Sequence, residues 1–401
     1  MEPKTIRWGI LATGGIAETF TKDLLVDPAT RNVTSIKHTV VAAASSSGAP
    51  RAQAFLTTVC APPSAKAYGS YEELAADPNV DIIYVATPHS HHYRNVKLCL
   101  ESGKNVLCEK AFTVNAAQAE ELVRIARQKN LFLMEALWTR YFPLSVYVRE
   151  TITSGRLGTI MRASADNSLD LSPEQNFSPE HRMVSPALAG GALLDMGIYS
   201  LTWIFQTLYT TQSPEARLNA PPPRVVSSMQ KYGPTGVDET VSMLLTFPRD
   251  PELGGDMHGV ATTGFRVAND IDGKGSAGPA VRIQGRKGEL QVWPPIYRPT
   301  RTRLVLADGT VEDKTWPQPG PGKGSNWFNG YSIAGTNPEG EGYGMFWEAD
   351  EAAMALIEGR KESRYQGLDE SVLIMQVMDD ARRQNGLLYP QDIEATDEKK
   401  Q

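Results

Sequence analysis

The chain has 401 residues, of which 41% are hydrophobic and 21% are charged, and its formal net charge is -6. This length exceeds one ordinary hydrophobic core and predicts two domains. The acidic balance and the lack of a basic patch argue against nucleic acid as a partner. No apolar run has the length expected of a membrane span, so no membrane partner is predicted either.

The N-terminal stretch, MEPKTIRWGI, lacks the apolar core of a signal peptide, and we therefore expect a cytoplasmic protein. Cys60, Cys99 and Cys108 show no metal-ligand spacing and are expected to be reduced and buried. The HSHH run at 89–92 has no cysteine or carboxylate partner at ligand spacing nearby. No metal site is predicted.

From residue 5 to about 134, short β-branched runs alternate with amphipathic segments. The strand-like runs are TIRWGILA, HTVVAAASS, VDIIYVATP, KNVLCEK and LFLME. Because they are apolar throughout, they predict a parallel sheet covered on both faces by helices. The sequence thus indicates an α/β protein whose residues 1–135 form a doubly wound, dinucleotide-binding Rossmann domain.

Beyond about residue 136 the regular alternation ends. Loops rich in proline and glycine separate strand-like runs at 241–247 and 301–307, and two helices are predicted at 348–359 and 370–386. We interpret 136–401 as a second domain, built on a mostly antiparallel sheet with a few helices.

The first predicted strand runs into GILATGGIA, residues 9–17. A dinucleotide fold needs a glycine-rich turn here, because the backbone must approach the pyrophosphate and the next helix must offer it free N–H groups. The three key positions are Ala12, Gly14 and Ala17, and the turn also contains Thr13, Gly15 and Ile16. Ala12 departs from the usual glycine, so a tight turn without a ligand remains the alternative.

The end of the second predicted strand selects the cofactor in this fold, since NAD enzymes usually carry an acid there. This chain has Ser45, Ser46 and Ser47 with Arg51 one helical turn later, and no carboxylate. Hydroxyls and a guanidinium suit a 2′-phosphate, so the sequence favours NADP. A serine that merely caps a helix is the alternative.

Two further strands end in polar residues, one at Thr87-Pro88 and the other at Glu109-Lys110. Ligands bind at the carboxyl edge of open α/β sheets. We therefore expect Lys110 to lie beside the nicotinamide end of a bound dinucleotide, whereas a lysine at a random strand end is usually a solvated surface group.

The segment GGALLDMGIYSLTWIF, residues 190–205, predicts a helix in the second domain. Asp195 and Tyr199 are four residues apart and share one face of such a helix. The apolar sides are marked by Leu194, Ile198, Leu201 and Phe205. The carboxylate and the phenol either satisfy each other in the core or face a cleft.

Five motifs together, GILATGGIA, TPHSHH, VLCEKAF, MEALWTRYFP and GGALLDMGIY, resemble the glucose-fructose oxidoreductase and inositol dehydrogenase family. The resemblance runs from residue 6 to about 390. Within the family the chain is similar to the NADP-linked D-xylose dehydrogenases of fungi and to the dimeric dihydrodiol dehydrogenases. Two residues depart from the family pattern, Ala12 in the glycine turn and Ala111 in place of the proline of Glu-Lys-Pro.

The resemblance implies a Rossmann domain followed by an α/β domain with a large open sheet, whose exposed face often forms a homodimer interface. It implies that Lys110 and Tyr199 are the catalytic pair, with Asp195 nearby to orient a sugar hydroxyl or the tyrosine. Trp138 is expected to be a flat wall for the sugar or the nicotinamide, with interdomain packing as the alternative. His92 matches a family position that supports the cofactor site.

The predicted activity is NADP-dependent oxidation of an aldose at C1, with D-xylose giving D-xylonolactone. Tyr199 is the expected base and Lys110 is expected to lower its pKa. Loops such as 170–187 and 290–300 are expected to set the substrate. The alternatives are a trans-dihydrodiol dehydrogenase and a non-catalytic dinucleotide sensor, the second of which is disfavoured by the presence of both Lys110 and Tyr199.

Overall fold

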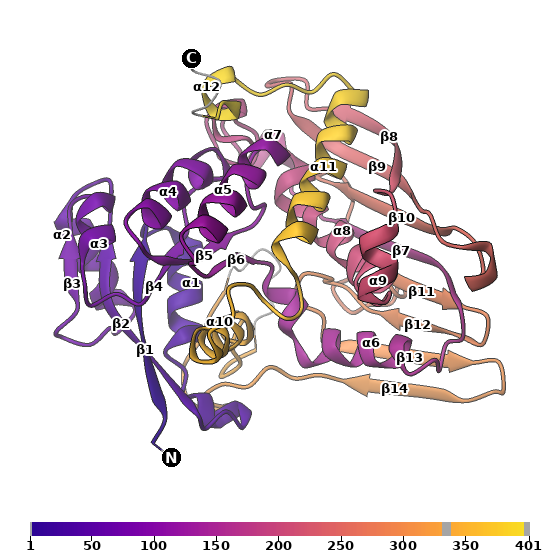
Figure 1. Ribbon diagram of the computed structural model, residues 1–401, viewed down its shortest axis with the longest axis horizontal. Coiled ribbons are helices and arrows are strands. Elements are labelled where there is room, and N and C mark those ends of the chain that lie inside the picture. The colour runs from indigo at the N-terminus through magenta and orange to yellow at the C-terminus, as the bar shows by residue number, and fades with distance from the viewer. Residues whose placement is uncertain (1, 331–337, 397–401) are drawn as a thin grey trace.

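The computed structural model of the protein describes residues 2–330 and 338–396. Its two sheets lie side by side in Figure 1. The first is six-stranded with the order β3-β2-β1-β4-β5-β6, and every neighbouring pair in it is parallel. Its strands are β1 Lys4–Leu11, β2 Ile36–Ala44, β3 Lys66–Tyr68, β4 Ile82–Val85, β5 Asn105–Glu109 and β6 Leu133–Ala136.

Helices connect these strands, as the apolar runs predicted. They are α1 Gly15–Leu24, α2 Ala49–Thr58, α3 Tyr71–Ala76, α4 His89–Glu101 and α5 Ala116–Gln128. The side chain of Asn115 accepts a hydrogen bond from the backbone N–H of Gln118 and so caps α5. The strand order reverses between β1 and β4, which places the ligand-binding crevice at the carboxyl ends of these strands.

The second sheet is eight-stranded, with the order β14-β13-β12-β11-β7-β10-β9-β8. Only its β7–β10 pair is parallel. The strands are β7 Ile160–Ser168, β8 Arg224–Lys231, β9 Asp238–Phe247, β10 Met257–Gly264, β11 Val281–Gly285, β12 Gly288–Val292, β13 Arg301–Leu306 and β14 Val311–Thr315. Buried and more exposed residues alternate along β9 and β10, and the helical segment of the π-turn Leu193–Gly197 and α8 (Ile198–Ile204) covers their buried face. The predicted fold class is confirmed.

The remaining helices surround the second sheet or return to the first. They are α6 Pro143–Thr153, α7 Pro173–Asn176, α9 Pro214–Asn219, α10 Phe346–Glu358, α11 Leu368–Gln384 and α12 Gln391–Glu394. In Figure 1 the yellow α11 runs between the two sheets, where it contacts α5, β6 and β8. The chain thus returns to its N-terminal half, and the division at residues 135 and 136 stays a prediction.

Two expectations from the sequence need correction. Cys99 and Cys108 are buried, but Cys60 is exposed, because it lies just after the end of α2 at the surface. The 24-residue segment Pro186–Tyr209 has the length and apolar composition of a membrane span, although none was expected. Its most apolar window is 89% buried within the protein, which is how a core helix satisfies the same criterion.

Candidate active site

A pocket of about 630 Å³ opens where the carboxyl edge of the first sheet meets the helical segment that carries Asp195 and Tyr199. Ten of the residues predicted for the site line it, namely Gly14, Gly15, Ile16, Thr87, Pro88, Glu109, Lys110, Trp138, Asp195 and Tyr199. The other predicted cofactor residues, Ala12, Thr13, Ser45, Ser46, Ser47, Arg51 and His92, lie outside this lining. Residues from both predicted domains therefore meet at one cavity.

The glycine turn after β1 has the geometry of an anion-binding helix start. Ala12 adopts a φ of 80°, the left-handed conformation in which glycine is normally preferred. Gly14 is the N-cap of α1, no side chain caps the helix, and a Cβ added at Gly14 would meet nothing within 4 Å. The start of α1 therefore has no side-chain cap and has room beside Gly14, which fits the pyrophosphate of a dinucleotide.

The end of β2 supplies the residues expected at the ribose end. The hydroxyl oxygen of Ser45 accepts a hydrogen bond from the backbone N–H of Ser47, while Ser46 and Ser47 are exposed. Gly48, not a serine, is the N-cap of α2, so the alternative role of the serines as its caps is not observed. The Arg51 guanidinium reaches back to within 3.5 Å of the carbonyl oxygen of Thr13 and so lies beside the glycine turn.

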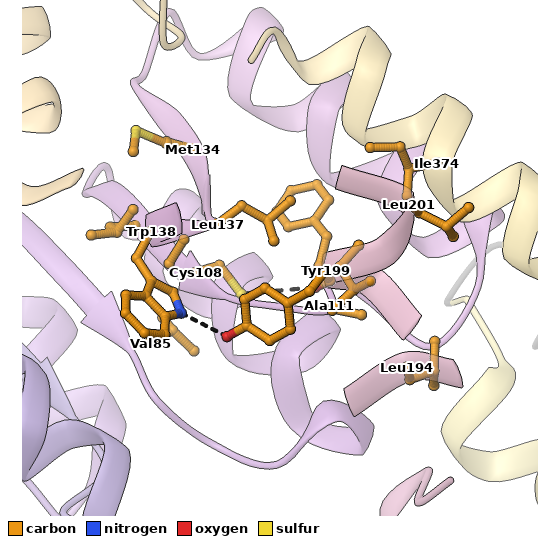
Figure 2. Packing of buried hydrophobic residues seen from close by; sticks show 14 of the residues in the cluster. Val85, Cys108, Ala111, Met134, Leu137, Trp138, Leu194, Tyr199, Leu201 and Ile374 are labelled. Carbon is orange, nitrogen blue, oxygen red and sulfur yellow. Dashed lines mark hydrogen bonds between the residues drawn. The ribbon is translucent and has the colours of Figure 1, made fainter. Parts of the chain in front are cut away.

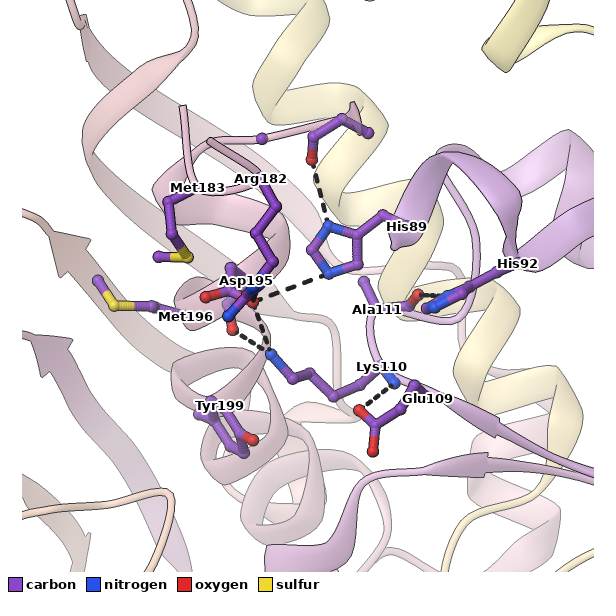
Figure 3. Close-up of polar contacts among 12 residues, drawn as sticks. His89, His92, Glu109, Lys110, Ala111, Arg182, Met183, Asp195, Met196 and Tyr199 are labelled. Atoms are coloured by element: carbon purple, nitrogen blue, oxygen red, sulfur yellow. Dashed lines mark hydrogen bonds and ion pairs between the residues drawn. The ribbon is translucent and has the colours of Figure 1, made fainter. Parts of the chain in front are cut away.

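Lys110 is not a solvated surface lysine. Its side chain is 11% exposed, and its Nζ donates to the backbone oxygen of Asp195 at 2.6 Å and to Asp195 Oδ1 at 3.0 Å. These contacts, drawn in Figure 3, join the end of β5 to the helix of the second sheet. Glu109 is held by the Tyr84 hydroxyl at 2.5 Å and accepts the backbone N–H of Lys110.

The helix predicted over 190–205 begins with a π-helical turn, Leu193–Gly197, and continues as α8. The four predicted apolar residues Leu194, Ile198, Leu201 and Phe205 are fully buried. Asp195 pairs with Lys110 and with Arg182 Nη1 at 3.1 Å, whereas the Tyr199 hydroxyl accepts a hydrogen bond from Trp138. Of the two alternatives for Asp195 and Tyr199, the structure therefore favours a shared cleft over mutual satisfaction.

Trp138 positions Tyr199. It lies in the short 3-10 helix Trp138–Tyr141, is only 2% exposed, and donates its indole N–H to the Tyr199 oxygen at 2.6 Å. Figure 2 shows this bond within the buried cluster. The indole also stacks on Tyr343 with ring centroids 4.8 Å apart. Most of the Trp138 surface thus contacts protein. This agrees better with the alternative role in interdomain packing than with the expected role as a flat wall for the sugar or the nicotinamide.

The electrostatics of the pocket keep Asp195 ionised and Tyr199 neutral. Burial alone would raise the pKa of Asp195, but Lys110 and Arg182 hold the pKa of that carboxyl well below its usual range. Burial raises the pKa of the Tyr199 phenol well above its ordinary value, and the nearby Glu109 raises it further. The net direction is opposite to the lowering by Lys110 that the sequence predicted, although the Lys110 Nζ lies 5.1 Å from the centre of the Tyr199 ring.

The histidines at 89–92 make contacts with the backbone or with neighbouring side chains. His92 is fully buried, and its two ring nitrogens lie 2.7 and 2.8 Å from the carbonyl oxygens of Thr87 and Ala111. His92 therefore holds together the two loops that carry Pro88 and Lys110, and so supports the pocket without lining it. Within the described part of the chain, no group of three or more His, Cys, Asp or Glu side chains is arranged to hold a metal ion.

The sequence missed several residues that line the pocket. His89 lies beside Asp195, and Arg182 pairs with it. Tyr297 and Tyr343 add aromatic rings near Trp138, and Phe177 stacks on His181 with ring centroids 4.4 Å apart. Phe177, Arg182 and Tyr297 lie in the loops 170–187 and 290–300, which were expected to influence the substrate, but no periodic pattern marked which of their residues line the pocket.

The sequence matches two family models. Residues 6–137 match an oxidoreductase family with an NAD-binding Rossmann fold, and residues 146–291 match the GFO/IDH/MocA C-terminal domain. The chain is 51% identical over 394 residues to the NADP(+) D-xylose 1-dehydrogenase of Hypocrea jecorina, covering 97% of this chain and 94% of that protein. It is 36% identical over 387 residues to the human trans-1,2-dihydrobenzene-1,2-diol dehydrogenase, covering 96% and 99% of the two chains.

Solved structures share the fold at lower identity. A levoglucosan dehydrogenase in complex with NADH and levoglucosan superposes with a TM-score of 0.74 at 16% identity, covering 96% of this chain and 98% of that one. An aldose-aldose oxidoreductase from Caulobacter crescentus gives a TM-score of 0.68 at 20% identity, covering 95% of this chain and 97% of that one. With both halves matched, the chain belongs to the GFO/IDH/MocA family of oxidoreductases.

Proposed function

We propose that the protein is an NADP-dependent aldose dehydrogenase that oxidises D-xylose at C1 to D-xylonolactone. The observation that carries this proposal is the convergence of Lys110, Asp195 and Tyr199 on one pocket beside the glycine turn of α1. The similarity to a D-xylose 1-dehydrogenase over 97% of the chain supports it. Water then opens the lactone to the acid.

The side chains divide the work as follows. An ammonium has three donors, and two of those of Lys110 point to Asp195, so the third binds the hydroxyl oxygen at C1 of the sugar. Tyr199, fixed by the indole N–H of Trp138, takes the proton of this hydroxyl in its phenolate form. A bound NADP would supply the acceptor for the hydride that leaves C1. In the reverse direction, the neutral phenol donates the proton.

NADP fits the cofactor end better than NAD. Ser46, Ser47 and Arg51 are exposed at the end of β2, where hydroxyls and a guanidinium bind a 2′-phosphate that a carboxylate would repel. We expect Arg51→Ala to lower kcat/KM for NADP by about 10-fold to 100-fold, the value of a charge-assisted hydrogen bond, with little change for NAD. Equal catalytic efficiency of the unmodified protein with the two cofactors would contradict this assignment.

A trans-dihydrodiol dehydrogenase is the second candidate. Phe177, Tyr297 and Tyr343 give the pocket aromatic walls that suit an unsaturated ring. The relatives that are 36% identical carry this activity in their names. Both candidate reactions use the same catalytic pair, so the substrate panel must separate them.

The first experiment is NADPH formation by the purified protein with D-xylose, D-glucose, L-arabinose and a trans-dihydrodiol. Strong turnover of D-xylose supports the proposal, and preference for the dihydrodiol favours the second candidate. If every substrate is inert while NADP still binds tightly, a dinucleotide sensor replaces both.

Tyr199→Phe tests the base. It should retain NADP binding and lose about 10²-fold to 10⁴-fold in kcat, the usual contribution of general acid-base catalysis. Tyr147→Phe, on α6 away from the pocket, is the matched control and should retain full turnover. Near-normal turnover of Tyr199→Phe would rule out the role.

We further propose that the protein is a cytoplasmic homodimer that uses the open face of its second sheet, with a small sugar as its partner molecule. Val226 on β8 and Leu244 on β9 are directly paired on that face and are 67% and 58% exposed. Two neighbouring apolar side chains of this size favour a contact surface on the face of the sheet opposite α8.

A further inference from the structure

We propose that His89 binds substrate, with its Nε2 accepting a hydrogen bond from the hydroxyl on the carbon next to the reacting carbon. This inference rests on the proposed function, because it requires a substrate with two adjacent oxygens. His89 is the first residue of α4 and lines the pocket beside Asp195. Figure 3 shows its ring between the Asp195 carboxylate and a backbone carbonyl.

The backbone fixes the tautomer of the His89 ring. Its Nδ1 lies 3.2 Å from the carbonyl oxygen of Ala189. A carbonyl oxygen only accepts hydrogen bonds, so the proton must be on Nδ1. In the neutral ring, Nε2 then carries a lone pair and no hydrogen.

The environment keeps the ring neutral. His89 is 7% exposed, and burial lowers its pKa to about 3. The ionised Asp195 opposes this shift, whereas Lys110, Arg182 and His92 reinforce it. Near neutral pH the pocket therefore presents Nε2 as a hydrogen-bond acceptor.

No protein group among residues 2–330 and 338–396 donates to this acceptor. Asp195 Oδ1 lies 3.9 Å from Nε2, which is too distant for a hydrogen bond, and this oxygen is itself an acceptor. His89 Nε2 and Asp195 Oδ1 are thus two acceptors that face each other in the cavity, with no hydrogen between them. A substrate hydroxyl that donates to Nε2 would supply this hydrogen.

The position of Lys110 indicates which hydroxyl this is. Lys110 Nζ lies 3.0 Å and His89 Nε2 lies 3.9 Å from the same oxygen, Asp195 Oδ1. If Lys110 binds the oxygen at the reacting carbon, a second oxygen at Nε2 must be on a carbon close by. The oxygens of a vicinal diol meet this requirement, and in an aldose the second one is the 2-hydroxyl.

Two substitutions separate binding from support of the fold. Asparagine at position 89 can keep the donation to Ala189 through its amide, but it has no acceptor at the Nε2 position. Glutamine can place its carbonyl oxygen near the Nε2 position. If His89 only supports the fold, asparagine should replace it better than glutamine. If His89 accepts a hydrogen bond from a substrate hydroxyl, glutamine should replace it better than asparagine.

The test compares D-xylose with its 2-deoxy analogue by kcat/KM and by calorimetric Kd in the presence of NADP. In the unmodified protein we expect the deoxy sugar to be about 10-fold poorer, the value of one hydrogen bond to a buried acceptor. His89→Asn should reduce this preference to nearly one while keeping the melting temperature, and His89→Gln should restore part of it. His91→Leu, at the exposed histidine two residues later, is the control and should leave the preference unchanged.

An unchanged preference in His89→Asn, or a better replacement by asparagine than by glutamine, overturns the proposal. If no sugar is turned over, the proposed function fails, and the Kd values alone decide on His89. Equal binding of the two sugars by the unmodified protein, or binding of neither, then overturns it.

Discussion

At the scale of single residues, Ala12 shows how one methyl group adds strain to the glycine-rich turn before α1. Its φ of 80° lies in the left-handed region, which costs an L-residue about 1–2 kcal/mol and glycine almost nothing. Ala12 is also the position where the fingerprint usually has glycine. The sequence therefore departs from the motif while the backbone keeps the conformation that the motif requires.

Ala12→Gly is expected to raise the free energy of unfolding by about 0.5–1 kcal/mol, because the relief of strain exceeds the extra entropy of glycine in the unfolded chain. Ala54→Gly, at an exposed position in α2, is the matched control and should lower it by about 1 kcal/mol. Urea denaturation measures both, and a loss of stability in Ala12→Gly would show that the turn is not strained.

The pKa of Tyr199 predicts the pH dependence of turnover. Burial raises this pKa well above its ordinary value, so the phenol is protonated near neutral pH and the base form grows as the pH rises. We expect kcat/KM for sugar oxidation to increase by up to about tenfold per pH unit on the alkaline side. A pH profile measured with D-xylose checks this, and a plateau already reached at neutral pH would contradict it.

At the scale of elements, a single carboxylate fixes the start of the helix that carries Asp195 and Tyr199. Asp238, the first residue of β9, is fully buried and accepts the backbone N–H of Leu193 at 2.5 Å. Gly191 makes room for this side chain, since a Cβ there would lie 2.0 Å from Asp238 Oδ1. Its φ of 126° is also in the region that glycine favours.

Gly191→Ala should lower the free energy of unfolding by about 3 kcal/mol or more, because neither the contact nor the backbone conformation can be kept. Turnover should fall as well, since the helix start carries Asp195. Gly233→Ala is the control, as its Cβ meets nothing within 4 Å, and its effect should stay within about 0.5 kcal/mol. Thermal unfolding of the unmodified protein and the two variants measures these effects. An equal loss of stability in both variants would contradict the role of Gly191.

The same helix shows where prediction from sequence ended. Its apolar face was predicted correctly, because a helical period is visible in the order of residues. The π-helical turn at Leu193–Gly197 was not predicted. Asp238, whose carboxylate binds the start of this helix, lies 45 positions further along the chain than Leu193, and no local pattern relates the two residues.

At the scale of the whole molecule, a buried carboxylate joins the C-terminal part of the chain to the dinucleotide-binding helix. Asp23 at the end of α1 accepts the backbone N–H groups of Tyr343, Gly344 and Met345 and the side chain of Asn329. Tyr343 in turn stacks on Trp138, which holds Tyr199. The position of Tyr199 thus depends on segments that are 320 positions apart in the chain.

The open face of the second sheet predicts the oligomeric state. Light scattering should give the mass of a dimer, and Leu244→Glu should give that of a monomer, because a buried unpaired carboxylate at the interface is costly. Leu253→Glu, at an equally exposed leucine outside the strands, is the control and should leave the mass unchanged. A monomer mass of the unmodified protein at micromolar concentration would rule out the dimer.

The sequence by itself determined the parallel sheet, the glycine turn, and the delivery of Thr87 and Lys110 to its carboxyl edge, since strand period and chain order are local properties. It also indicated Asp195 and Tyr199, through their spacing on a helix. Only the tertiary structure decided that Lys110 pairs with Asp195, that Trp138 holds Tyr199, and that His89 faces the same carboxylate. These contacts join residues that are 61 to 106 positions apart in the chain, so no local pattern could reveal them. Burial in the pocket also raises the pKa of Tyr199, whereas the sequence had predicted that Lys110 would lower it.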